Sequence, residues 1–282
     1  MERVFWVRLF TIGALLSGLV VLCWPSTSDG LLRVRFLDVG QGDAILIQTP
    51  DGVEMLVDGG AGSAVLRSLG SLQPWYDRTI DVVVATHPDT DHLGGLVDVL
   101  TRYEVANIWE VAAEHDVPAA DAFSKAAALE NASVYLPQAG DIFRLGASTT
   151  VQIFSPQGDT TNWQSNNASI VLKIQYGDIG FLLSGDAPTS IENYLAGTYG
   201  AGLEAEVLKL GHHGSKTSTS DIWLDAVTPQ YAVISAGLGN RYGHPNQEVM
   251  GRVFARNITT FSTMTEGTIT FATDGKTVWK EE

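Results

Sequence analysis

The most informative stretch of the chain is IDVVVATHPDTDH, residues 80–92. Its first seven residues form a continuous apolar run with the composition of a β-strand that is covered on both faces. The carboxyl end of this run delivers His87, and residues 93–103 beyond the motif have helical spacing. We therefore expect a strand–loop–helix unit whose loop turns several polar side chains toward one centre.

Four side chains of this loop are ligands of the kind that divalent ions take in proteins: His87, Asp89, Asp91 and His92. Two ions held a few ångströms apart can share a bridging water, as in two-metal hydrolases. The competing interpretation is a solvated turn whose aspartates cap the following helix. That interpretation explains one aspartate, but not four ligand side chains directly after a buried strand. The loop therefore predicts a two-metal site.

Two further loops carry histidines, so five of the six histidines fall in three loops. In the run GHHGSK, residues 211–216, His212 and His213 could ligate a metal, donate a proton or hold a phosphate oxygen. The run NRYGHPN, residues 240–246, contains His244. The sixth, His115, is interpreted as an ordinary surface residue.

Charged residues near these loops complete the candidate site. A second apolar strand ends in Ser184-Gly185-Asp186, and a carboxylate at a rigid strand end could bridge two metals. The basic residues near the loops, which would meet an anionic substrate, are Lys209, Lys216 and Arg241. Chance grouping of these three on a solvated face is the alternative.

The remaining pattern predicts an α/β fold of two halves. Strands are expected at residues 32–39, 44–48 and 53–58, and later at 150–154, 169–176, 181–184, 206–210 and 231–235. Helices are expected near residues 190–196, 220–226 and 247–256, and residues 259–280 are expected to close as a hairpin through Glu266-Gly267. Two such halves can stack their sheets and cover the outer faces with helices, which gives a four-layer αββα sandwich of two mixed sheets.

The N-terminus is distinct from this domain. Residues 9–24 carry no charge and follow Arg3 and Arg8, a pattern typical of a signal peptide or membrane anchor. We therefore divide the chain into an N-terminal segment with its linker, residues 1–29, and a hydrolase domain, residues 30–282. The positive-inside tendency predicts an extracytoplasmic domain, either secreted or anchored to the cytoplasmic membrane. A buried N-terminal helix is the alternative.

Composition restricts the chemistry and the partners. The single cysteine, Cys23, lies in the apolar run, so the domain has neither a disulfide framework nor a cysteine metal site. The formal net charge is −15, which excludes binding of duplex DNA through a broad basic face. A nucleic-acid substrate would need bound cations and a local basic cluster.

These motifs resemble the metallo-β-lactamase superfamily, and within it the C-terminal hydrolase domain of ComEC-type DNA-uptake proteins. The similarity covers roughly residues 32–280 in the family's order. The runs that carry it are FLDVGQGD (36–43), LVDGG (56–60), HPDTDHLGG (87–95), NNAS (166–169), SGD (184–186), HHGS (212–215) and YGHP (242–245).

The resemblance implies a role for each matching residue. His87 and Asp89 would hold the first metal, Asp91 and His92 the second, and Asp186 would bridge them. His244 would complete the second site, and His212 or His213 would donate a proton, although one of them could instead be a ligand. Substrate contacts are expected from the remaining polar residues of these loops: Asn166, Asn167, Ser215, Lys216 and Arg241.

Two departures bear on the metal. Many superfamily members have histidine where this chain has Asp89, and a further histidine where it offers Asn166 or Asn167. Oxygen ligands in place of imidazoles shift the preference from Zn²⁺ toward Mn²⁺. We therefore expect two divalent ions, Mn²⁺ or Zn²⁺. We expect neither tight zinc binding nor lactamase activity.

The function expected is hydrolysis of a phosphodiester, with single-stranded DNA in DNA uptake as the substrate that the resemblance implies. Asp91 would orient the attacking water, and His212 or His213 would protonate the leaving oxygen. The chain has at most one apolar span, so a membrane channel would have to be a separate partner. Two alternatives remain: hydrolysis of a lactone, thioester or nucleotide diester, since the fold hosts many reactions, and a non-catalytic partner of that channel.

Overall fold

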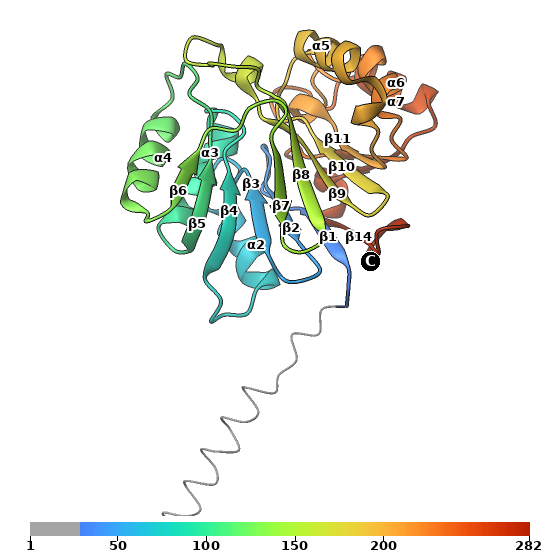
Figure 1. The fold of residues 1–282 in the computed structure, drawn as a ribbon. Coiled ribbons are helices and arrows are strands. Elements are labelled where there is room, and N and C mark those ends of the chain that lie inside the picture. Colours follow the sequence, from blue (N-terminus) through green and yellow to red (C-terminus); the bar gives the residue numbers. More distant parts are fainter. Residues whose placement is uncertain (1–28) are drawn as a thin grey trace, which may run out of the picture.

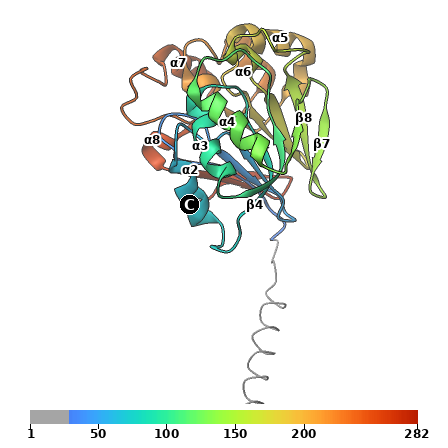
Figure 2. The ribbon, with the colours of Figure 1, turned by 90° about the vertical axis from the view of Figure 1, so that its left-hand side faces the viewer.

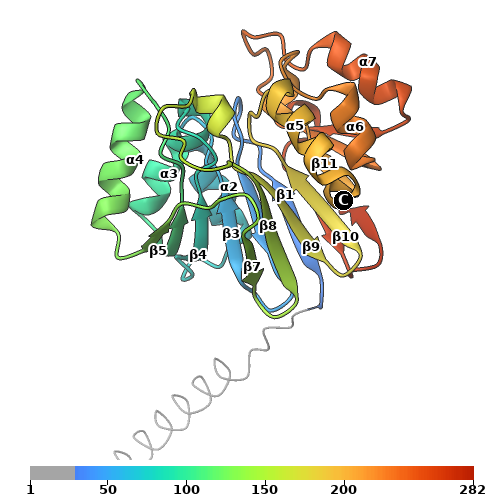
Figure 3. The same cartoon turned by 45° about the horizontal axis from the view of Figure 1, so that its top comes forward.

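The structure is a computed structural model that describes residues 29–282, and it contains two β-sheets packed face to face between helices (Figure 1). Helices α2 (Ala64–Leu72), α3 (Thr90–Leu100) and α4 (Pro118–Leu129) lie on one outer face (Figure 2). Helices α5 (Thr189–Tyr199), α6 (Asp221–Val227) and α7 (Gln247–Ala255) lie on the other (Figure 3). The expected four-layer α/β sandwich is therefore confirmed.

The first sheet has eight strands in the order β15-β14-β1-β2-β3-β4-β5-β6. Their bounds are β1 Leu32–Phe36, β2 Ile45–Gln48, β3 Glu54–Val57, β4 Thr79–Val84, β5 Glu104–Trp109, β6 Ser133–Tyr135, β14 Ile269–Thr273 and β15 Val278–Lys280. The second has seven in the order β13-β12-β11-β10-β9-β8-β7. Their bounds are β7 Ile142–Leu145, β8 Thr149–Ser155, β9 Val171–Tyr176, β10 Ile179–Leu183, β11 Val207–Lys209, β12 Tyr231–Ile234 and β13 Thr259–Ser262.

The alternation of side chains along each strand explains the layers. In β10, Phe181 and Leu183 enter the core between the sheets, whereas Leu182 packs under the helices of the second sheet. Phe271 on β14 bridges the two sheets, since its ring centroid lies 6.4 Å from that of Phe181 and 6.3 Å from that of Phe36. Strands buried on both faces read as continuous apolar runs for this reason.

The expected strands and helices are present, with one correction at the C-terminus. Residues 259–280 do not form a hairpin through Glu266-Gly267. Strand β13 instead pairs parallel with β12, and β14 pairs antiparallel with β1 in the other sheet. The short helix α8 (Thr263–Glu266) and the turn at Gly267 therefore carry the chain from one sheet to the other, and the true hairpin is β14–β15.

The carboxyl ends of parallel strands meet at one end of the sandwich. Strands β3 to β6 run parallel in one sheet, and β10 to β13 run parallel in the other. Open α/β sheets place their functional sites at this end. The loops after β3, β4, β10, β11 and β12 gather here, and they contain most of the candidate residues.

The expected N-terminal signal peptide or anchor falls on residues that, apart from Asp29, lie outside the described part of the chain. Within residues 29–282, none of the helices has the length and apolar character needed to cross a membrane.

Candidate metal centre

The His87 loop connects strand β4 to helix α3. His87 follows the end of β4, and Asp89 occupies the N-cap position of α3 without using its side chain as a cap. The Asp89 carboxylate instead accepts a hydrogen bond of 2.5 Å from Ser165 Oγ in the loop before β9. The interpretation of this loop as a helix-capping turn therefore does not account for Asp89.

Three fully buried imidazoles point their Nε2 atoms at the buried carboxylate of Asp186. The distances are 3.8 Å from His87 to Oδ2, 3.4 Å from His92 to Oδ1 and 3.6 Å from His213 to Oδ2. Asp89 lies 3.6 Å from His87 Nε2, and Asp91 lies 3.3 Å from His213 Nε2. Two carboxylates of the loop thus flank the group formed around Asp186.

The opposite edge of each ring is fixed by a hydrogen bond. Nδ1 of His92 lies 2.7 Å from Asp58 Oδ2, and Nδ1 of His213 lies 2.9 Å from the carbonyl oxygen of Ser235. Nδ1 of His87 lies 3.0 Å from the Thr86 hydroxyl, which itself donates to Asp58 Oδ2 at 2.7 Å. Because these acceptors hold a proton on Nδ1, each Nε2 lone pair is left free to bind a metal.

Ligand atoms that share an ion should lie close together and lack other partners. His87 Nε2, His92 Nε2, His213 Nε2 and Asp186 Oδ1 are all buried without a hydrogen-bond partner among the described residues. Ligands about 2 Å from one ion lie roughly 3–3.5 Å from each other, close to the separations found here. Buried polar atoms without partners are otherwise rare and costly. The residues present therefore fit divalent metal ions.

The charge of the cluster favours cations. Burial opposes the charged form of His213, yet the carboxylates of Asp186 and Asp43 raise its pKa to about 9. Burial likewise opposes the charge of Asp91, but the neighbouring His213 imidazole, 3.3 Å away, and the charge of His92 hold its pKa well below the usual range. The carboxylates thus draw positive charge to this place, as a metal site requires.

His212 and His244 lie toward the rim. His212 Nε2 is 3.5 Å from Asp186 Oδ2, and its Nδ1 is 3.1 Å from the Thr217 hydroxyl. The His244 ring lies 5.7 Å from that of His212 and 6.4 Å from that of His213, and it stacks on Tyr242 at 5.6 Å. His244 is half-buried, whereas His213 is 1% exposed and deep in the cluster.

Backbone geometry brings the two adjacent histidines to one side. His212 and His213 both have positive φ angles, 48° and 56°. Non-glycine residues rarely adopt this left-handed conformation, and those that do cluster at functional sites. Both rings can therefore face Asp186, although they are neighbours in the chain.

The residues expected to contact substrate are dispersed. Arg241 is exposed and lies over the Tyr242 ring, 4.9 Å from its centroid, beside an open pocket of about 410 Å³ that Asp91 also lines. Asn167 lines a different hollow beside Trp163, and Asn166, on the same short 3-10 helix, is half-buried. Ser215 is buried and its hydroxyl bonds that of Thr217, whereas Lys216 is exposed.

Lys209 requires a correction. It was expected near the substrate, but its side chain is fully buried and forms an ion pair with the buried carboxylate of Asp43. Asp43 also lies 3.4 Å from His213 Nδ1 and 4.0 Å from His92 Nδ1. Together with His92, Asp186 and His213 it forms a group whose potential ligand atoms all lie within 4.8 Å of one another.

The loop that carries Asp43 depends on glycine. Gly42 has a φ of 122°, and a Cβ at this position would lie 2.1 Å from the carbonyl oxygen of Asp91. Only glycine therefore allows the backbone of Asp43 to approach and donate to that carbonyl at 3.2 Å. Sequence reasoning assigned no role to Asp43 or Asp58, although the flanking glycines were a signal for close backbone approach.

A four-layer sandwich with paired His/Asp loops at its strand ends defines a metal-dependent hydrolase of the αββα class. The chain belongs to the metallo-beta-lactamase superfamily, which residues 37–237 match. In solved structures, the fold resembles the metallo-beta-lactamase fold protein YhfI from Bacillus subtilis, with a TM-score of 0.59, 14% identity and coverage of 89% of this chain and 99% of that one. It also resembles CmlA, a diiron beta-hydroxylase from Streptomyces venezuelae, with a TM-score of 0.55, 14% identity and coverage of 85% and 53%.

Three sequence relatives are named as a competence protein, a ComE operon protein and a recombination protein. The chain is 30% identical to Competence protein ComA of Neisseria gonorrhoeae, over 91% of this chain and 34% of the relative. It is 27% identical to ComE operon protein 3 of Bacillus subtilis, over 87% and 33%, and 32% identical to Recombination protein 2 of Haemophilus influenzae, over 86% and 29%. The chain thus spans about a third of the length of these curated relatives.

Proposed function

We propose that this chain is a metal-dependent phosphodiesterase that cleaves single-stranded DNA. The observation that carries the proposal is the convergence of three unpartnered imidazole Nε2 atoms on Asp186, beside an open pocket that Asp91 and Arg241 line. An anionic diester can approach this centre only where cations offset the surrounding carboxylates. Metal ions and the exposed guanidinium supply that positive potential.

Two ion positions follow from the distances around Asp186. His87 and Asp89, whose ligand atoms lie 3.6 Å apart, would hold one ion. Asp91, His92 and His213 would hold the other, and Asp186 would reach both. This assignment makes His213 the ligand that motif order alone assigned to His244.

When bound, two such ions supply an acidified water and neutralise charge on the phosphate oxygens. The protein's own side chains do the remainder. Asp91, whose side chain is 29% exposed, reaches the open pocket and would position the attacking water. His244, which is half-buried at the rim, would donate a proton to the leaving oxygen in place of His212 or His213, the donors expected from the sequence.

The DNA substrate rests on the relatives and on charge. The relatives named for competence and recombination support a role in DNA uptake for this chain as well. A net charge of −15 disfavours non-specific duplex binding, so a flexible single strand that contacts a small basic rim is the better substrate. Arg241 and Lys216 are the exposed cations of the histidine loops.

The proposed carboxylate ligands also affect which metal ion the site would prefer. Asp89 and Asp91 add oxygen donors to a site that would otherwise be rich in imidazole, which favours Mn²⁺ beside Zn²⁺. Ser165 orients the Asp89 carboxylate by its short hydrogen bond, so that side chain is built to serve as a ligand.

We place the domain outside the cytoplasm as part of the same proposal, with the apolar run of residues 9–24 as its signal or anchor and a separate membrane channel as its partner. Fractionation of cells that express the full chain, followed by protease treatment of intact cells, tests this placement. Protection of the domain from external protease in cells without an outer barrier would contradict it.

The decisive experiment uses the full-length chain in detergent, stripped of metal and reloaded with Mn²⁺ or Zn²⁺. We expect labelled single-stranded DNA to be cut, and Asp91→Asn to abolish cutting while Asp98→Asn, on the same helix, does not. His213→Gln should lower the number of bound ions, whereas His244→Gln should retain them and lose activity mainly on substrates with poor leaving groups.

Other results would select the alternatives. Turnover of a small diester without any cleavage of DNA would favour a small-molecule hydrolase. Bound metal without turnover of either substrate would favour a non-catalytic partner of the channel. Full nuclease activity in Asp91→Asn would refute the mechanism.

A further inference from the structure

A second hollow lies beside His87, bounded by a different set of elements from those around Arg241. It has a volume of about 170 Å³ and is bounded by the end of β4, the loop that follows β5, and helix α4. His87 lines this hollow while its Nε2 faces Asp186. The hollow and the cluster around Asp186 therefore share His87 as a common wall.

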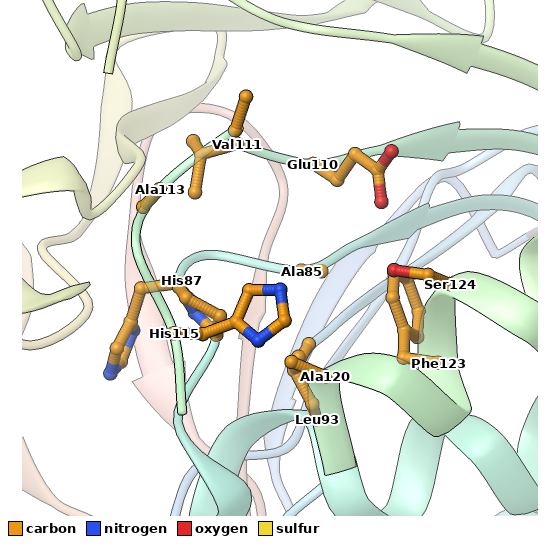
Figure 4. A pocket seen from close by; sticks show the side chains of 12 residues that line it. Ala85, His87, Leu93, Glu110, Val111, Ala113, His115, Ala120, Phe123 and Ser124 are labelled. Carbon is orange, nitrogen blue, oxygen red and sulfur yellow. The ribbon is translucent and has the colours of Figure 1, made fainter. Parts of the chain in front are cut away.

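The hollow is lined by both apolar and polar groups. Ala85 and Phe123 contribute apolar surface, and Ser124 and Glu110 lie on the side away from His87 (Figure 4). His115 lies between them in this view. Apolar surface combined with a few oriented polar groups is typical of small-ligand sites.

The Glu110 carboxylate is the unusual member of this set. Its side chain forms no hydrogen bond or ion pair with any described residue, although its backbone N–H donates to the carbonyl of Tyr135 at 3.1 Å. Burial raises the pKa of this carboxyl, as expected for a partly desolvated acid without a cationic neighbour. The group can accept two hydrogen bonds that the protein does not supply.

The charge of the hollow disfavours a phosphate. Its lining includes a carboxylate and no lysine or arginine, so an anion would be repelled. A ligand for this hollow should pack against its apolar residues and donate hydrogen bonds to Glu110. A planar group with apolar faces and N–H donors on its edge can do both. Nucleobases have this combination of properties.

We propose that this hollow is a nucleobase subsite next to the scissile phosphate, with Glu110 as the residue that selects guanine; the inference rests on the proposed function. Guanine presents a ring N–H and an amino N–H side by side, which suit the two oxygens of a carboxylate. Adenine and cytosine offer an amino group without an adjacent ring N–H, and thymine offers one N–H between two carbonyls. The order expected is guanine, then adenine and cytosine, then thymine.

The first test measures binding and does not depend on turnover. The four deoxynucleoside monophosphates are titrated calorimetrically onto the Mn²⁺-loaded, full-length protein. A bidentate contact predicts that dGMP binds about 5- to 150-fold more tightly than dTMP. Glu110→Gln should reduce this ratio to within a few-fold of one, whereas Ser124→Ala should retain most of it. Equal affinities in the wild type, or a preference retained in Glu110→Gln, would overturn the proposal.

The second test measures hydrolysis of thymine tracts that carry one guanine, adenine or cytosine, beside bis(4-nitrophenyl) phosphate, which has no base. We expect Glu110→Gln to lose the preference for the guanine-containing strand and to hydrolyse the base-free diester at the wild-type rate. Thermal melting checks that the variant is folded, and removal of an unpaired carboxylate should not destabilise it. Failure of both substrates with selective dGMP binding would refute the nuclease but not the subsite, whereas cleavage without base preference would refute only the subsite.

Discussion

The ion pair between Lys209 and Asp43 is buried beside His213, and its loss should lower the free energy of unfolding of the domain. Lys209 is 0% exposed and Asp43 is 1% exposed. Burial by itself would raise the pKa of Asp43, but the charges of Lys209 and His213 lower it to about 2. The substitution Lys209→Met keeps most of the side-chain volume and removes the charge, so Asp43 is left buried without its main partner.

The expected size follows from this burial. Removing one partner of a buried ion pair costs about 3–5 kcal/mol, because the remaining charge is neither solvated nor balanced. In a domain of this size each kcal/mol shifts the Tm by about 2–4 °C, so the expected decrease is roughly 6–20 °C. Asp43→Asn/Lys209→Met should recover much of the loss, since the double variant buries no unpaired charge.

The assay is urea and thermal unfolding of metal-free protein, because bound ions would add stability by mass action. The matched control is Lys280→Met, whose ion pair with Glu266 (3.3 Å) lies at the surface, with side chains 31% and 32% exposed. Exposed pairs contribute about 0–1 kcal/mol. If Lys209→Met unfolded within about 1 kcal/mol of the control, or if the double variant recovered nothing, Lys209 would not balance a buried charge.

Three further predictions concern the fold and the rim of the site. Burial raises the pKa of Glu192 from its ordinary value of 4.5 to about 7, so between these pH values the folded state holds a proton that the unfolded chain has released. Stability should therefore fall as the pH rises from 4.5 to 7, by on the order of 3 kcal/mol, and Glu192→Gln should remove that slope in melts across this range. Gly95→Ala should lower the Tm of the domain by several °C, because the added Cβ would lie 1.9 Å from the carbonyl oxygen of Gly59. In the control Gly70→Ala, the added Cβ meets nothing within 4 Å, so this change should be neutral or stabilising by up to about 1 kcal/mol. Equal Tm values for the two variants would contradict this explanation. Tyr242→Ala should raise the KM for single-stranded DNA by several-fold and leave the KM for a small diester unchanged. The reason is that the Tyr242 ring lies under Arg241 and is 54% exposed beside the pocket. An equal effect on both substrates would argue against a role in binding the strand.

The strands and the helix that frame the metal loop could be predicted because their signals are local. Residues 82–85 are apolar on both faces, because β4 is covered by a helix layer on one side and by the second sheet on the other. The prediction of a C-terminal hairpin was wrong because the pairing partner of a strand is not determined by the sequence next to it. A turn at Glu266-Gly267 is compatible with a hairpin or with a crossover between sheets, and only the register of β14 on β1 distinguishes them.

The metal loop was predicted from residue types, but the direction of each imidazole was not. Motif order made His244 a ligand and left the role of His213 open. The structure places His213 within 3.6 Å of Asp186 because two consecutive left-handed residues turn the chain inward. No periodic pattern encodes such a turn, and no glycine at either position indicates it. Lys209 was interpreted as substrate-facing for a related reason, since a strand of three buried residues does not reveal that one charge is paired.

Asp58 shows most clearly why the site depends on residues well separated in the chain from its ligands. It lies at the end of β3 with a φ of 59° and is 1% exposed. Its Oδ1 accepts the backbone N–H of Thr86 at 2.9 Å, while its Oδ2 accepts from the Thr86 hydroxyl and from His92 Nδ1. Because the same hydroxyl lies against His87 Nδ1, one carboxylate fixes the rings of both histidines. The LVDGG run is therefore part of the candidate metal centre although it precedes His87 by some thirty residues. We expect Asp58→Asn to weaken binding at both proposed ion positions, and metal counting can separate this loss from the single-ion loss expected of His213→Gln.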